Sequence, residues 1–84
     1  IGFGLKAIPN PATGDMLIVV SFGESHQGRL LIRDAQGRLI ESFEVSRANP
    51  ELKLNWTDHA RGLYFATLEL STGNRAHIKL LVQD

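Results

Sequence analysis

The residues best suited to catalysis are scattered along this 84-residue sequence. The three histidines are His26, His59 and His77. None of them has a second histidine at the sequence spacing typical of metal ligands. Asp58 precedes His59, but a nucleophile such as Ser71 would have to be brought to them by the fold, and no Gly-x-Ser-x-Gly segment is present. Glu41 and Glu44 fall on opposite faces of one expected strand. The sequence therefore predicts no catalytic residue, no cofactor site and no metal site, and the protein is not expected to be an enzyme.

Composition and charge exclude other classes of function. Nine Lys and Arg balance nine Asp and Glu, so there is no basic excess for nucleic acid or for an anionic membrane surface. The longest strongly apolar run, Met16–Val20, is far shorter than the roughly 20 residues of a membrane-spanning helix. With no cysteine, disulfides and thiolate metal sites are excluded. The glycosylation pattern Asn55-Trp56-Thr57 carries little weight, because Trp56 is expected in the core.

Seven segments have the composition and period-two alternation of β-strands: residues 5–8, 16–22, 29–34, 38–45, 51–56, 63–70 and 75–83. Residues 16–22 are apolar on both faces, which favours a central strand. Turn residues recur every 8 to 12 positions, and no window has a sustained helical period. This pattern predicts an all-β, immunoglobulin-like sandwich of about seven antiparallel strands in two sheets, with a barrel as the alternative. We expect one domain over residues 1–84, with residues 1–4 left from a linker to an upstream segment.

The alternation also predicts which residues form the core and which shape the turns. The residues expected between the sheets are Leu52, Leu54, Trp56, Tyr64, Leu68, Ile78 and Leu80. Gly37 and Gly62 stand at abrupt reversals of the chain, so we expect backbone conformations that β-branched residues resist. Asp34 opens a tight turn and is expected to accept a backbone hydrogen bond within it.

Four short motifs remain, and each has a plain structural interpretation. They are Pro9-Asn10-Pro11, Asp34-x-x-Gly37-Arg38, Gly62-x-Tyr64 and Lys79-Leu80-Leu81-Val82. In order, they indicate a rigid entry turn, a tight hairpin, a backbone bend before a buried aromatic residue, and a lysine that lays its stem on apolar surface.

In this order and spacing, the motifs resemble the C-terminal sorting domain (type A) of the type IX secretion system of Gram-negative bacteria. The resemblance implies an immunoglobulin-like domain that acts as an export address and is recognised by the outer-membrane translocation machinery and its shuttle proteins. In many members a sortase-like cysteine protease removes the domain and joins the passenger to anionic lipopolysaccharide, whereas other members retain it. The implied location is the outer-membrane surface or the medium, reached through the periplasm. The implied recognition residues are Pro9, Asn10, Pro11, Asp34, Gly37, Arg38, Gly62, Tyr64, Lys79, Leu80, Leu81 and Val82.

Two interpretations of function follow. The first is a non-catalytic targeting domain whose last strand is accessible and could pair with a partner by β-augmentation. The alternative is a retained immunoglobulin-like accessory domain that binds protein or anionic lipopolysaccharide at the cell surface. Aromatic residues make up only 7% of the chain and most fall on expected core faces, which weighs against a sugar-binding platform.

Overall fold

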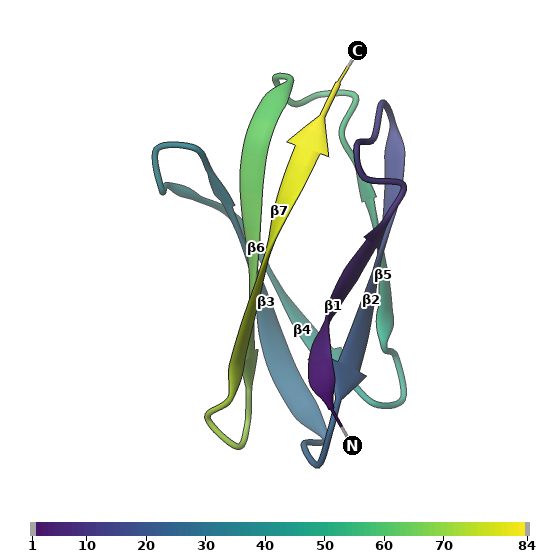
Figure 1. Ribbon diagram of the computed structural model, residues 1–84, viewed down its shortest axis with the longest axis vertical. Helices are drawn as coiled ribbons and strands as arrows, with labels where there is room; N and C mark the ends of the chain where they lie inside the picture. The colour runs from purple at the N-terminus through teal and green to yellow at the C-terminus, as the bar shows by residue number, and fades with distance from the viewer. Residues whose placement is uncertain (1, 84) are drawn as a thin grey trace.

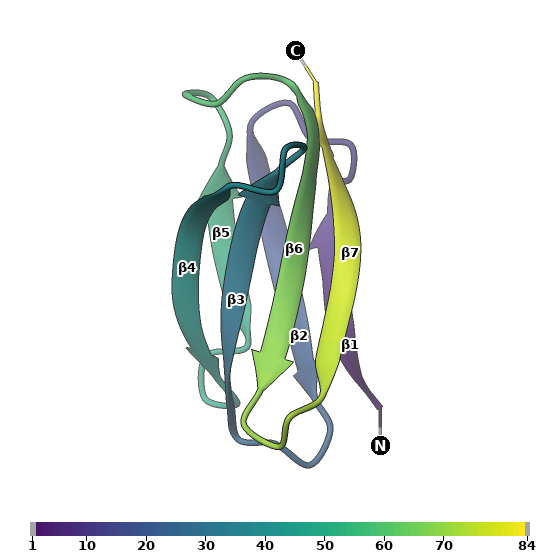
Figure 2. The same cartoon turned by 90° about the vertical axis from the view of Figure 1, so that its left-hand side faces the viewer.

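The computed structural model describes residues 2–83 as a two-layered sandwich of antiparallel strands (Figures 1 and 2). The strands are β1 (Phe3–Ile8), β2 (Asp15–Phe22), β3 (Gln27–Asp34), β4 (Leu39–Ser46), β5 (Glu51–Asn55), β6 (Gly62–Leu70) and β7 (Arg75–Val82). One sheet has the order β1-β2-β5 and the other the order β4-β3-β6-β7. The predicted seven-stranded, immunoglobulin-like sandwich is confirmed.

Strand β2 lies in the centre of the three-stranded sheet, as its two apolar faces predict. It pairs with β1 on one side and with β5 on the other. Its alternate residues Met16, Ile18, Val20 and Phe22 are buried between the sheets. The intervening side chains are only partly covered, because the opposite face of this sheet is open to solvent.

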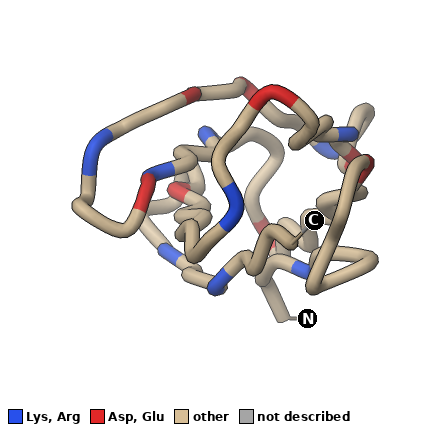
Figure 3. The backbone as a smooth tube through the Cα atoms, turned by 90° about the horizontal axis from the view of Figure 1, so that it is seen from above, with Lys and Arg blue, Asp and Glu red and all other residues tan. Residues whose placement is uncertain are grey.

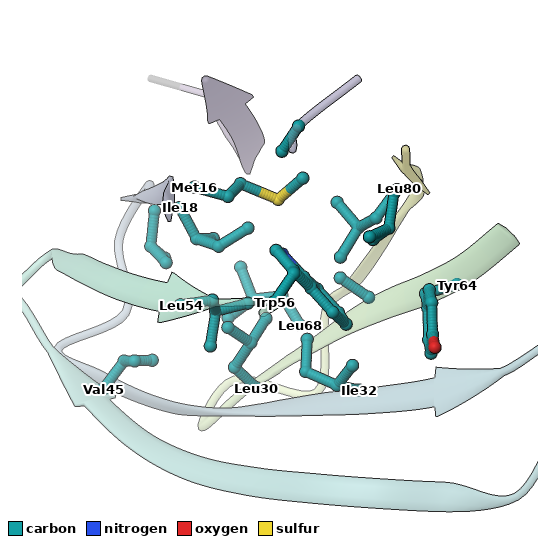
Figure 4. Packing of buried hydrophobic residues seen from close by; sticks show 14 of the residues in the cluster. Met16, Ile18, Leu30, Ile32, Val45, Leu54, Trp56, Tyr64, Leu68 and Leu80 are labelled. Carbon is teal, nitrogen blue, oxygen red and sulfur yellow. The ribbon is translucent and has the colours of Figure 1, made fainter. Parts of the chain in front are cut away.

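The core brings together residues from both sheets around Trp56, which is 4% exposed (Figure 4). Five of the seven predicted core residues are buried: Leu54, Trp56, Tyr64, Leu68 and Leu80. Leu52 and Ile78 are half-buried and pack against this cluster from its border. The clean alternation of β5 and β6 therefore identified the inward faces correctly, and the two residues near the border are covered on one side only.

The first strand begins at Phe3, two residues before the start expected from the sequence. Phe3 pairs with Phe22 and Gly4 pairs with Ser21. A neighbouring strand can impose an extended conformation on glycine despite its low strand propensity, which is why composition alone placed the boundary too late. The assignment of residues 1–4 to a linker stays a prediction.

Candidate functional site

All four motifs meet at one end of the sandwich, the end at which β7 finishes (Figure 1). The connections β1–β2, β3–β4 and β5–β6 lie at this end, and the hairpin between β6 and β7 lies at the opposite end. We call it the motif end and define it by residues 9–12, 34–38, 60–64 and 79–83. Segments far apart in the sequence are thus neighbours here.

The strand register makes the motif end a continuous row across the four-stranded sheet. Asp34 on β3 is opposite Tyr64 on β6, and Tyr64 is opposite Leu80 on β7. Two pairs further along, Gly62 is opposite Val82, and Val82 also forms a parallel bridge to Ala12. The motif residues are therefore one structural unit and not four separate features.

The Asp34-x-x-Gly37-Arg38 hairpin is stabilised by the Asp34 carboxylate, which accepts hydrogen bonds from the backbone of the same turn. The backbone amides of Gln36 and Arg38 donate to Oδ1 of Asp34 at 3.0 and 2.9 Å, and Arg38 Nε donates to Oδ2 at 2.9 Å. The hydrogen bond from the Arg38 amide is the main cause that lowers the pKa of Asp34 below its usual value. Gly37 has a φ of 86°, where a side chain would be strained. Both expectations for this turn are confirmed.

The Gly62-x-Tyr64 motif contains a tyrosine that is bonded to the connection preceding its strand. The Tyr64 hydroxyl donates to the carbonyl of Ala60 at 2.5 Å, and its ring centroid lies 4.6 Å from that of Trp56. Gly62 has a φ of 140°, as predicted for the bend. A tyrosine bonded to the backbone just upstream is the tyrosine corner of immunoglobulin-like sandwiches. The sequence predicted the packing of Tyr64 but not this hydrogen bond, although a tyrosine at the start of a penultimate strand could have indicated it.

The Pro9-Asn10-Pro11 motif joins the β1–β2 connection to the last strand, β7. Asn10 Nδ2 donates to the carbonyl of Lys79 at 2.8 Å, and the amide of Leu81 donates to Asn10 Oδ1 at 2.9 Å. The side-chain amide of Asn10 thus forms hydrogen bonds with two backbone groups of β7, as the backbone of a neighbouring strand would. The peptide bonds preceding Pro9 and Pro11 are both cis.

Ala12 continues this contact toward the end of β7. Its amide donates to the carbonyl of Leu81 at 2.9 Å, and the amide of Gln83 donates to its carbonyl at 2.8 Å. Ala12 is also 1% exposed, although it lies outside the seven strands predicted from the sequence. We call these contacts between residues 10–12 and residues 79–83 the clasp.

The clasp corrects one expectation from the sequence. The last strand was expected to be an accessible edge, but its outer backbone groups from the Lys79 carbonyl to the Gln83 amide are already bonded. A partner could add a strand here only by displacing residues 10–12. The side chains of Lys79 and Leu81 remain exposed, whereas those of Leu80 and Val82 are buried in the core.

The exposed and buried motif residues have different possible roles. Those on the surface are Pro9, Asn10, Pro11, Gly37, Arg38, Lys79 and Leu81. Those that are half-buried or buried are Asp34, Gly62, Tyr64, Leu80 and Val82. The buried members Tyr64, Leu80 and Val82 can affect recognition only through the shape of the domain.

The potential catalytic residues do not form a site. Asp58 and His59 lie in the β5–β6 connection, and Ser71 lies in the β6–β7 turn at the opposite end (Figure 1). His77 Nδ1 lies 3.1 Å from Thr67 Oγ1 on the neighbouring strand, and the His59 ring packs edge-on against Trp56. Within residues 2–83, no group of three histidine or acidic side chains could hold a metal ion.

Sequence reasoning missed a polar cluster at the opposite end of the sandwich. Arg47 Nε donates to the carbonyl of Ser25 at 2.8 Å, and Arg47 Nη2 donates to the carbonyl of Gly23. The Ser25 hydroxyl is 2.7 Å from that of Thr72, and Ser25 is 2% exposed. These residues come from three different connections, so no local pattern in the sequence could have revealed the cluster.

The chain was compared with curated proteins and with models of protein families. No curated protein matches the chain. No helix of residues 2–83 has the length and apolar character needed to cross a membrane. A family model described as the secretion system C-terminal sorting domain matches residues 6–83, which include all four motifs. The chain belongs to the C-terminal sorting domain family of the type IX secretion system, and it is a sorting signal for export through that system.

Proposed function

We propose that the export address is the folded motif end and not a linear peptide. The observation that carries this proposal is the continuous row that joins Asp34, Tyr64 and Leu80 across three strands. Tyr64 and Leu80 are buried, so a partner that reads an unfolded tail would have no use for their positions in the fold. The surface offered to a partner is then made by the exposed motif residues around this row.

The partners that we propose are the outer-membrane translocon of the type IX system and its shuttle proteins. Family membership supports contact with this machinery and delivery to the cell surface or the medium. The proposed route passes through the periplasm to the outer-membrane surface. There, a sortase-like cysteine protease would act on the domain and attach the passenger to anionic lipopolysaccharide.

We also propose that the domain itself catalyses no reaction, in keeping with a family that is in general non-catalytic. The separation of Ser71 from Asp58 and His59 supports this proposal. The chemistry of removal and attachment would then belong to the protease that receives the domain.

The test is a fusion of residues 1–84 to the C-terminus of a reporter that carries a signal peptide, produced in a host with a type IX system. We expect the reporter on the cell surface or in the medium, and in the periplasm when the domain is absent. A matched fusion with Trp56→Ala, which opens the centre of the core, should stay in the periplasm if the address is a folded surface. Export of an unfolded Trp56→Ala fusion at the normal rate would contradict the proposal.

Truncation of residues 81–84 should also retain the reporter in the cell envelope. This variant loses three of the four hydrogen bonds of the clasp and the buried Val82, so its folding has to be measured together with its export. Normal surface delivery without these residues would show that the end of β7 is not part of the address.

A further inference from the structure

The outer face of the four-stranded sheet has an exposed apolar area close to the clasp. Leu63 on β6 is directly opposite Leu81 on β7, and each is 38% exposed. In the next row, Leu39, Arg33, Phe65 and Lys79 follow one another across β4, β3, β6 and β7. We call these six residues the Phe65 face. Leu39, at 54%, is the most exposed of its apolar members.

The two cations of the Phe65 face occupy the strand positions on either side of Phe65. Arg33 and Lys79 are both direct cross-strand neighbours of Phe65. Within residues 2–83, neither forms an ion pair with a carboxylate. A surface with unpaired positive charge around apolar side chains is complementary to an apolar surface bordered by acidic groups.

On the other half of the same sheet face, each arginine lies next to a glutamate carboxylate. Arg29 Nε lies 3.4 Å from the Glu44 carboxylate, and Arg75 Nη2 lies 3.4 Å from that of Glu69. Figure 3, which looks onto the motif end, shows acidic and basic residues interleaved around the whole molecule. On the outer face of this sheet, the cations without an ion pair among residues 2–83 are therefore confined to the Phe65 face, in a chain whose net charge is zero.

The outer face of the three-stranded sheet provides the comparison. Lys6 is opposite Val19, and Val19 is opposite Glu51, so acidic and basic side chains alternate there. Lys53 is opposite Leu17 on the same face. Lys6 and Lys53 form no ion pair among residues 2–83 either, but Glu51 lies on their sheet face and their apolar neighbours Leu17 and Val19 are only partly exposed, so they make a matched control.

We propose that the Phe65 face docks a protein of the export machinery through an apolar surface bordered by Asp or Glu side chains. This inference rests on the proposed function and adds to it the position and chemistry of the contact. A lipid surface fits less well, because recruitment to anionic lipid uses clusters of about 4–8 basic residues and this face offers two unpaired cations. Lys79 and Leu81 belong both to this face and to the clasp, so the clasp fixes the border of the docking surface.

The test compares two charge reversals in the reporter fusion. Arg33→Glu with Lys79→Glu places acidic groups against the acidic border of the partner, and we expect export to slow by about tenfold or more. Lys6→Glu with Lys53→Glu makes the same change in net charge on the other sheet and should leave the rate within about twofold, as surface changes outside a contact do. Thermal unfolding of both purified fusions shows that each variant is folded.

A photoreactive amino acid at position 63 supplies the second measurement. In exporting cells it should form an adduct with a component of the type IX machinery, whereas the same residue at position 17 should not. The adduct should disappear with Arg33→Glu and Lys79→Glu and persist with Lys6→Glu and Lys53→Glu. If the adduct formed equally well in both charge-reversal variants, the proposed charge complementarity would be wrong.

The remaining outcomes separate this inference from the proposed function. If the wild-type fusion is not exported, the proposed function fails. If it is exported and the Arg33→Glu, Lys79→Glu variant is exported equally fast, only the docking inference fails. Binding of the wild-type fusion to phosphatidylglycerol vesicles, lost in this variant, would overturn the protein partner in favour of anionic lipid.

Discussion

Replacing Asn10 with alanine removes the side chain that fastens the first connection to β7. Its amide donates to the Lys79 carbonyl and accepts from the Leu81 amide, 69 and 71 residues further along the chain. No other side chain in residues 2–83 has hydrogen bonds to the outer edge of β7. The substitution therefore isolates the side-chain part of the clasp and leaves the two backbone contacts of Ala12 in place.

The size of the effect follows from the number and exposure of the bonds. Each net hydrogen bond contributes about 0.5–1.5 kcal/mol, so losing both should lower the free energy of unfolding by about 1–3 kcal/mol. Because Asn10 is exposed, water can solvate the two freed β7 groups, which favours the lower half of this range. In a domain of this length, 1 kcal/mol corresponds to a fall in Tm of roughly 4–8 °C.

Amide hydrogen exchange followed by NMR shows where the effect lies. Exchange at the Leu81 amide should accelerate in Asn10→Ala, because its acceptor is gone, and exchange at Gln83 should change less. Thr13→Ala, a change at an exposed neighbour, should leave both amides and the Tm unchanged. If Asn10→Ala kept the wild-type Tm and the wild-type exchange at Leu81, the clasp would contribute nothing to stability and our reasoning would be wrong.

Three further predictions concern the core and the turns. Trp56→Ala should cost about 3–5 kcal/mol in urea unfolding, whereas Trp56→Phe should cost below about 2 kcal/mol because it keeps an aromatic ring and removes an Nε1 that is buried without a partner. Tyr64→Phe should cost about 1 kcal/mol by losing the bond to Ala60, and a wild-type unfolding curve would exclude a structural role for that hydroxyl. The folded-state pKa of Asp34 lies below its ordinary value of 3.8, so its stabilisation is present above that value and is lost as the pH falls through the folded pKa. Unfolding measured from neutral to acidic pH should therefore show a weaker pH dependence in Asp34→Asn than in wild type.

The sequence predicted the strands and their buried faces well, because both depend on the pattern of neighbouring residues along the chain. In β5 and β6, period-two alternation assigns each side chain to the core or to solvent, and Leu54, Trp56, Tyr64 and Leu68 are buried as that rule requires. The turns were equally readable, since Asp34 bonds amides only two and four residues away. Such features need no knowledge of the rest of the chain.

The clasp and the polar cluster around Arg47 could not be predicted in the same way. Asn10 between two prolines has the composition of a turn, and its partners on β7 are set by how the two sheets stack. Arg47 stands in a polar break of the sequence, yet its guanidinium bonds the carbonyls of Gly23 and Ser25. In both cases the bonded atoms belong to segments that only the tertiary fold brings together.

This distinction bears on how a sorting signal can be found by mutation. Tyr64 and Val82 are buried, and Asn10 bonds β7, so substitutions there change the shape or stability of the domain whether or not a partner touches them. Lost export in such variants is expected from either cause. Lys79 offers a cleaner position, because its side chain is exposed while its part in the clasp is made by its backbone carbonyl. A change confined to that side chain alters the surface and leaves the clasp bonded, so its effect on export reports recognition rather than folding.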